Sequence, residues 1–93
     1  MAPRLEQELI SHLPADDTHP YRTGAWRPQH REWTDTDPVI EGELPTDLNG
    51  AYLRNCENPL VPNRERYHPF DGDGMIHSTF FREGHVEYRN RFV

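Results

Sequence analysis

The sequence has no lysine, a single cysteine and no apolar run long enough to cross a membrane. Sixteen acidic residues outnumber ten arginines, and the net charge of −6 argues against nucleic-acid binding, which needs a basic surface. Because Cys56 is the only cysteine, the chain can form neither an internal disulfide nor a cysteine-rich zinc site. The first residues are acidic and lack the apolar core of a signal peptide. We therefore expect a cytoplasmic protein with no nucleic-acid partner and no transmembrane segment.

Apolar residues are also scarce. Hydrophobic residues make up 33% of the chain, and its mean hydropathy is −1.00. A length of 93 residues allows one small domain at most. Nine prolines and six glycines indicate a loop-rich chain. Such a chain buries little core unless something else covers it.

Residues 3–13 carry the best helical pattern. Pro3 suits a first helical turn, and Pro14 would end the helix. The apolar residues at helical spacing are Leu5, Leu9, Ile10 and Leu13. We predict a short terminal helix that docks or frays. A membrane-surface helix is the alternative, although its polar face lacks the usual basic residues, so peripheral membrane contact stays open.

Three large aromatic residues are spaced through the polar stretch of residues 15–37, namely Tyr21, Trp26 and Trp33. A free linker rarely carries such residues, so we predict an extended arm that lies over a larger body with the rings as anchors. The alternative is that the rings pack against this chain's own strands. The sequence thus divides into residues 1–37, a helix and an arm, and residues 38–93, a set of strands.

Strand patterns dominate residues 38–93. Residues 38–44 and 50–55 are predicted as short strands that flank a turn over residues 45–49. Residues 75–92 form the clearest element, because two runs rich in Thr, Phe, Tyr and Val flank Glu83-Gly84, a two-residue hairpin turn. This turn sets a register with the pairs Arg82–His85, Phe81–Val86, Thr79–Tyr88, His77–Asn90 and Met75–Phe92.

The predicted hairpin has apolar residues on both faces, since Ile76 and Phe80 lie opposite Met75. This pattern predicts a hairpin that is covered on both sides. The strand that ends near Val93 has no predicted partner for its outer edge, and intact proteins usually blunt such edges. We therefore expect the chain to be a piece of a longer protein.

A turn motif lies in residues 67–77, which read Tyr-His-Pro-Phe-Asp-Gly-Asp-Gly-Met-Ile-His. Asp-Gly steps mark tight turns, because glycine supplies positive φ and aspartate bonds the nearby backbone. We interpret the motif as structural, with acids that accept backbone N–H bonds and apolar anchors on both sides. Its residues are His68, Phe70, Asp71, Gly72, Asp73, Gly74 and Met75.

Two functional alternatives exist for this turn. An Asp-x-Asp step with glycine opens several calcium loops, but the later ligands of such loops are missing here. His68 and His77 with a carboxylate from Asp71 or Asp73 supply the residue types of a facial-triad iron site. The local spacing does not decide between these alternatives and the structural interpretation.

Several motifs in series resemble the opening of the carotenoid cleavage oxygenases, a family that includes the lignostilbene dioxygenases and the retinal-pigment-epithelium isomerase. The similarity runs from about residue 20 to the last residue, in the same order and at similar spacing. Cys56-Glu57 departs from the family pattern, in which many members carry Gly-Pro, and we interpret it as variation in a structural turn. The motifs are residues 42–45, 47–50, 52–55, 58–59, 67–77 and 88–93.

The resemblance implies an all-β chain that forms the N-terminal arm and first strands of a seven-bladed β-propeller. It implies a ferrous ion held by four histidines and cleavage of a conjugated C=C bond of a carotenoid, apocarotenoid or stilbene by O2. In such enzymes those histidines lie well beyond the residues matched here. The resemblance therefore assigns no catalytic residue and no metal ligand to this chain, and we expect no iron on the chain alone.

Two functions of different classes follow. The first is an inactive fragment of an iron-dependent dioxygenase, whose full-length form would take a lipophilic polyene or stilbene and O2. The alternative is a small non-catalytic binding or scaffold module, with a calcium-type turn in residues 71–74.

Overall fold

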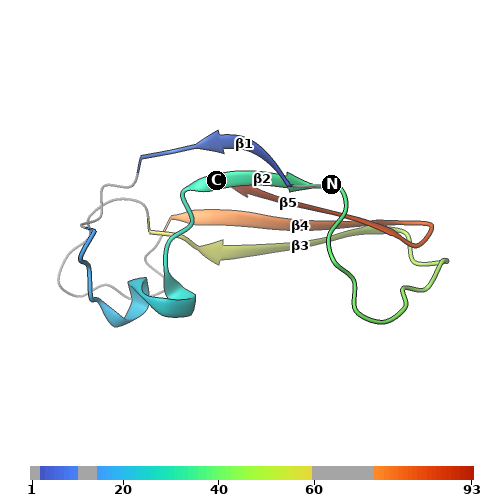
Figure 1. Cartoon of the computed structure of the whole chain (residues 1–93), viewed down its shortest axis with the longest axis horizontal. Coiled ribbons are helices and arrows are strands. Elements are labelled where there is room, and N and C mark those ends of the chain that lie inside the picture. Colours follow the sequence, from blue (N-terminus) through green and yellow to red (C-terminus); the bar gives the residue numbers. More distant parts are fainter. Residues whose placement is uncertain (1–2, 11–14, 60–72) are drawn as a thin grey trace.

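The computed structural model describes residues 3–10, 15–59 and 73–93, and these residues form one antiparallel sheet with almost no helix. The strand order is β1-β2-β5-β4-β3 (Figure 1). The strands are β1 (Arg4–Glu8), β2 (Arg31–Asp35), β3 (Gly50–Glu57), β4 (Gly74–Arg82) and β5 (His85–Phe92), and two short 3₁₀ helices are η1 (Pro20–Arg22) and η2 (Gly24–Trp26). The prediction of an all-β chain is confirmed.

The β4–β5 hairpin confirms the predicted turn and register. Strand pairing runs from Arg82 opposite His85 to Met75 opposite Phe92, with every predicted pair in between. Glu83 and Gly84 have φ angles of 50° and 81°. Positive φ at both central residues matches the twist of the flanking strands, which is why a two-residue turn suffices.

β3 extends the hairpin into a three-stranded meander. It pairs with β4 along its whole length, from Gly50 opposite Phe81 to Glu57 opposite Gly74. The predicted strand over residues 50–55 and the turn over residues 45–49 are therefore confirmed, and the Leu48 N–H donates to the Pro45 carbonyl at 3.3 Å within that turn.

The strand predicted over residues 38–44 is wrong, because these residues form no ladder. Val39 is 94% exposed, so its apolar side chain has no sheet face to pack on. Gly42 has a φ of 95°, which lies outside the strand region of the backbone map. The segment therefore connects β2 to β3 as a loop.

The helix predicted for residues 3–13 is also wrong over residues 3–10, where β1 forms instead. β1 pairs with β2, and the Leu9 N–H continues the contact by donating to the His30 carbonyl at 2.8 Å. Ile10, one of the apolar residues of the predicted helical stripe, is 84% exposed. Pairing with an existing strand satisfies the backbone of β1, and this tertiary contact overrides the local periodicity.

β5 does not have the bare outer edge that the sequence predicts. β2 occupies that edge, with Thr34 opposite Arg89 and Asp35 opposite Tyr88. Trp33, one of the three predicted anchors, therefore lies within the sheet. β1 and β3 become the outer strands of the sheet formed by the described residues.

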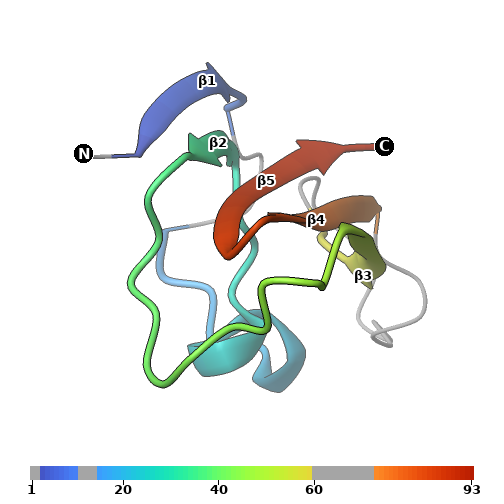
Figure 2. The same ribbon diagram turned by 90° about the vertical axis from the view of Figure 1, so that its right-hand side faces the viewer.

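The sheet curls around the segment that carries η1 and η2, as the turned view in Figure 2 shows. Met75 is the buried apolar residue of the described core, at 1% exposure. The buried polar or charged residues are Glu32, Thr34, Asn58, Ser78 and Asn90. Most of the buried side chains in this sheet are thus polar groups with hydrogen-bond partners.

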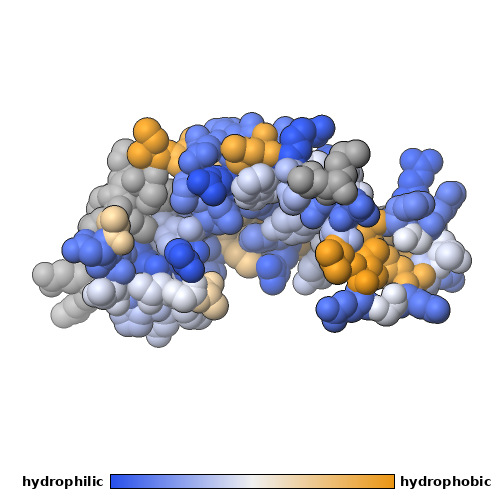
Figure 3. Space-filling model, viewed as in Figure 1, coloured by the Kyte–Doolittle hydropathy of each residue, from blue (hydrophilic) through white to orange (hydrophobic). Residues whose placement is uncertain are grey.

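Apolar side chains remain exposed over much of the surface, where Figure 3 shows separate hydrophobic patches on a mainly hydrophilic face. They include Ile40, Leu48, Tyr52 and Leu53, each more than 40% exposed. On the face of the hairpin that carries Phe80, the Arg89 guanidinium lies 4.8 Å from the Phe80 ring centroid. An arginine thus covers part of a ring that is only half-buried.

Candidate functional site: a cleft between the arm and the sheet

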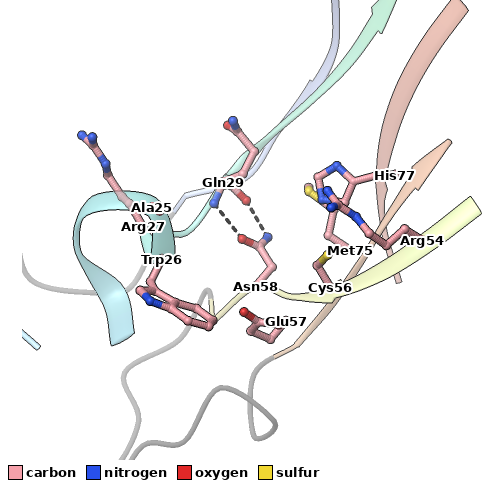
Figure 4. A pocket seen from close by; sticks show the side chains of 10 residues that line it. All are labelled: Ala25, Trp26, Arg27, Gln29, Arg54, Cys56, Glu57, Asn58, Met75 and His77. Carbon is pink, nitrogen blue, oxygen red and sulfur yellow. Dashed lines mark hydrogen bonds between the residues drawn. The ribbon is translucent and has the colours of Figure 1, made fainter. Parts of the chain in front are cut away.

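Asn58 fixes one end of the arm to the sheet. It follows β3 directly and is 4% exposed. Its Oδ1 accepts the Gln29 N–H at 2.7 Å, and its Nδ2 donates to the Gln29 carbonyl at 2.6 Å (Figure 4). A side-chain amide offers one acceptor and donors on the other side, so it can replace a neighbouring peptide group. The Asn58 side chain therefore joins the end of β3 to the residues that precede β2.

Asn90 does the same for β2 from the middle of β5. It is 2% exposed, accepts the Trp33 N–H at 2.5 Å and donates to the Arg31 carbonyl at 3.0 Å. Its Nδ2 also lies 3.5 Å from the Met75 sulfur. The ladder between β2 and β5 has two residue pairs, and this amide extends the connection beyond them.

Two charged side chains complete the attachment of β2. A Glu32 carboxylate oxygen accepts the Phe92 N–H at 2.7 Å. The Arg91 guanidinium donates to the Trp33 carbonyl at 2.8 Å and to the Thr34 hydroxyl at 2.7 Å. Beyond the ladder between β2 and β5, hydrogen bonds from side chains thus connect the two strands.

A cleft of about 370 Å³ lies between the arm held by these contacts and the face of β3 and β4. Arg54 pairs with His77 and Cys56 pairs with Met75, so these four side chains share one face of the sheet. Figure 4 shows them opposite the η2 segment, with Asn58 between the two walls. The chemically relevant lining residues are Trp26, Arg27, Arg54, Glu57, Met75 and His77.

His77 and Tyr88 form a neutral polar pair at the cleft. His77 Nδ1 lies 2.6 Å from the Tyr88 hydroxyl. Burial lowers the pKa of His77 below its usual value of 6.5, and the nearby Arg54 charge lowers this pKa further. Burial raises the pKa of Tyr88 above its usual value of 10.0, and Arg54 partly opposes that rise. The imidazole is therefore uncharged and the phenol protonated at neutral pH.

Four of the seven turn-motif residues, His68, Phe70, Asp71 and Gly72, lie outside the described residues. The other three stand at the start of β4. The Asp73 carbonyl accepts the Asn58 N–H, and the Gly74 carbonyl accepts the Val93 N–H at 3.2 Å. Met75 is buried beside Asn90.

Gly74 is needed for a different reason from the one the sequence suggests. Its φ lies outside the left-handed region, so the predicted positive φ is wrong at this position. A Cβ there would lie 2.9 Å from Val93 Cγ2 and 3.0 Å from Asn55 Oδ1. Close packing against these two side chains, rather than backbone freedom, favours glycine.

Sequence reasoning gave no separate role to Asn58, Asn90 and Arg54. Asparagine is depleted in strands, because its side chain competes for backbone hydrogen bonds. An asparagine in the middle of the predicted strand over residues 85–92 was therefore a usable signal. Gln29 gave no such signal, since its backbone rather than its side chain meets Asn58.

The described residues do not gather a metal-binding set. No group of three or more His, Cys, Asp or Glu side chains comes together within residues 3–10, 15–59 and 73–93. In the same part of the chain, no helix has the length and apolar character needed to span a membrane.

Residues 26–93 match the family model described as retinal pigment epithelial membrane protein. The chain is 41% identical over 81 residues to a carotenoid cleavage oxygenase of Mycobacterium tuberculosis, covering 85% of this chain and 16% of that protein. It is 40% identical over 90 residues to carotenoid 9,10(9′,10′)-cleavage dioxygenase 1 of Phaseolus vulgaris, covering 96% of this chain and 17% of that protein.

A solved structure shows the same fold. The lignostilbene dioxygenase of Pseudomonas brassicacearum, a β-propeller enzyme, superposes with a TM-score of 0.75 at 32% identity, over 82% of this chain and 16% of that chain. The chain thus spans about one sixth of the length of the proteins it matches. The strands over residues 50–57 and 74–92 fall within the family match.

Proposed function

Because the chain belongs to the retinal pigment epithelial membrane protein family, we propose that it forms part of an oxygenase that cleaves a conjugated C=C bond with O2. The observation that carries this proposal is the family match over residues 26–93, together with the superposition on a lignostilbene dioxygenase. The substrate class is a carotenoid, an apocarotenoid or a stilbene, in line with the names of the relatives. The propeller has seven blades in this proposal, and the protein is cytoplasmic.

The described residues of this chain do not fit the ferrous ion that the family resemblance implies. His77 already has its Nδ1 beside the Tyr88 hydroxyl, and the charge of Arg54 acts on its ring. A cation would be repelled by that guanidinium and would lack convergent donors among the described residues. We therefore assign the iron ligands to histidines outside this chain, and the chain alone is inactive.

The contribution of this chain is structural in the proposed enzyme. Asn58 and Asn90 hold the arm against β3 and β5, and buried amides with both partners satisfied specify one arrangement of strands. A sheet with so small an apolar core depends on such contacts and on cover from the remainder of the enzyme.

A chimera tests the proposed function. The segment of the M. tuberculosis relative that matches this chain is replaced by the corresponding residues of the chain. We expect the chimera to bind iron and to cleave its conjugated substrate with consumption of O2. A folded, iron-loaded chimera that does not cleave the substrate would contradict the proposal, and a cooperatively folded isolated chain would then favour the binding-module alternative.

The isolated 93-residue chain is the matched control. We expect no stoichiometric binding of Fe(II) in an anaerobic titration and no cleavage of the substrate. Stoichiometric binding that disappears in a His77→Ala or His68→Ala variant would show that the chain supplies its own iron ligands. A calcium titration of the same sample tests the alternative that the turn motif is a calcium-binding loop.

A further inference from the structure

The cleft between the arm and the sheet contains an arginine that can meet an anion. The whole chain carries a net charge of −6, and the charged residues that line the cleft are Arg27, Arg54 and Glu57. Figure 4 shows the Arg27 side chain directed away from the sheet wall, so Arg54 is the cation that faces the other lining residues.

Arg54 differs from most other described arginines because no partner for it is found among residues 3–10, 15–59 and 73–93. The guanidiniums of Arg4, Arg22, Arg31 and Arg89 each pair with a carboxylate. No hydrogen bond or ion pair joins Arg54 to another residue within the described parts of the chain. Arg54 lies opposite His77 in the pairing of β3 with β4, and its charge acts on both His77 and Tyr88.

The opposite wall of the cleft is aromatic. Trp26 lines it, and its ring is held edge-on to Tyr21, with 5.5 Å between the centroids and an interplanar angle of 75°. Trp26 is 43% exposed, so part of the residue is accessible to a ligand. Met75 adds an apolar floor. A volume of about 370 Å³ is enough for one ring with a short acidic side chain.

We propose that this cleft binds an aromatic monocarboxylate, with the carboxylate on the Arg54 guanidinium and the ring against Trp26. The fork of a guanidinium matches the two oxygens of a carboxylate. His77, which is uncharged, supplies a polar neighbour that does not compete for the anion. One unpaired guanidinium suits a single negative charge better than a phosphate, which usually draws several cations. This binding site is independent of the oxygenase proposal, because it needs neither iron nor turnover.

The test uses the 93-residue chain at a temperature and concentration at which circular dichroism shows its β-sheet and light scattering shows no aggregate, with trans-cinnamate as the probe and trans-cinnamamide as its neutral counterpart. A Trp33→Phe substitution leaves Trp26 as the only indole, so its fluorescence reports the cleft. Because a ligand that binds the folded chain stabilises it, a probe-dependent gain in β-sheet circular dichroism is a second readout. We expect cinnamate to change both signals and cinnamamide to bind about tenfold or more weakly.

Arg54→Gln should weaken cinnamate binding by about tenfold or more, and Arg54→Lys by less, since lysine keeps the charge but loses the fork. Arg82→Gln is the matched control, because Arg82 is exposed at the hairpin end and does not line the cleft. The control should bind as the parent does. Equal affinity for cinnamate and cinnamamide, unchanged affinity in Arg54→Gln, or no response of the parent chain would each overturn the proposal. None of these outcomes bears on the activity of the chimera, so the two proposals fail separately.

Discussion

At the residue scale, two asparagines decide how the arm meets the sheet. Asn58 and Asn90 are nearly inaccessible to solvent, and each uses its amide as a substitute peptide group. A buried amide of this kind is favourable only while all its partners are present, because an unpaired buried polar group costs the full desolvation energy. The attachment is therefore specific to this arrangement of the arm and the sheet.

We expect Asn90→Leu to lower the free energy of unfolding of the chimera by about 2–4 kcal/mol, since it leaves the Trp33 N–H and the Arg31 carbonyl without partners. Chemical denaturation measures the loss. Asn49→Ala is the control: its Oδ1 also accepts a backbone N–H, from Glu83 at 3.1 Å, but at an exposed site, and it should cost less than about 1 kcal/mol. Equal losses in the two variants would count against the buried clamp.

Gly74→Val should cost about 1–3 kcal/mol in the chimera, because its side chain meets Val93 and Asn55 at the start of β4. Asp73→Asn should cost less, since it keeps the main-chain carbonyl that accepts the Asn58 N–H. The melting temperatures of the two variants rank these costs. If Asp73→Asn abolished cleavage while the melting temperature and iron content stayed unchanged, the turn would have a catalytic or substrate-binding role instead.

The pair of His77 and Tyr88 predicts how stability depends on pH. The folded pKa of His77 lies below 6.5, so the unfolded chain takes up the proton first and stability falls as pH drops below about 6.5. The folded pKa of Tyr88 lies above 10.0, so stability also falls as pH rises above about 10. The charged residues that line the cleft with His77 are Arg54 and Glu57 on β3 and, across the cleft, Arg27.

A His77→Gln variant isolates the acid part of this dependence. The difference in unfolding free energy between the parent and the variant should shrink as pH falls through the lowered pKa of His77, which denaturation at several pH values measures. A difference that stays constant from about pH 8 to about pH 5 would show that folding does not lower the pKa of His77.

At the element scale, prediction from sequence succeeded where one local feature determined the geometry. Glu83-Gly84 fixed both the turn and the register of β4 and β5, because a two-residue loop leaves no freedom in pairing. It failed at Arg4–Glu8 and Arg31–Asp35, whose strand state depends on partners far away in the sequence. The cleft could not be predicted for the same reason, since Trp26 and Arg54 meet only after β2 has docked.

The turn between β4 and β5 also offers a stabilising change. Glu83 occupies a position with φ of 50°, where a side chain other than glycine or asparagine is strained. Glu83→Asn should raise the free energy of unfolding of the chimera by about 0.5–1 kcal/mol, which a shift in the denaturation midpoint measures. Gly84→Ala, at φ of 81°, should act in the opposite direction. A loss of stability in Glu83→Asn would mean that the carboxylate makes a contact that outweighs the strain.

At the scale of the whole molecule, the described part of the chain has little apolar core. Met75 is its one fully buried apolar residue, while Tyr52 and Leu53 on β3 are each about 60% exposed. Hydrophobic burial is the main source of folding free energy, and a sheet with so little of it is marginal. The satisfied polar contacts specify the arrangement of strands but add little net stability.

We therefore expect the isolated 93-residue chain to unfold in a broad, weakly cooperative transition or to aggregate, whereas the same residues fold within the chimera. Thermal melts followed by circular dichroism, with light scattering for aggregation, compare the two. A sharp, reversible melt of the isolated chain would contradict this expectation and would favour a self-standing module.

The strand order has a consequence for protein synthesis. β2 leaves the ribosome long before β5, the strand it must pair with, and the intervening 50 or so residues take roughly three to ten seconds to translate. During that delay the peptide groups of Arg31 and Trp33 have only water, β1 or cellular chaperones as partners, because the amide that binds them is carried by Asn90. A pause in translation within β4 therefore prolongs the life of an unpaired strand, and the nascent chain is most vulnerable to proteases and wrong partners at that stage.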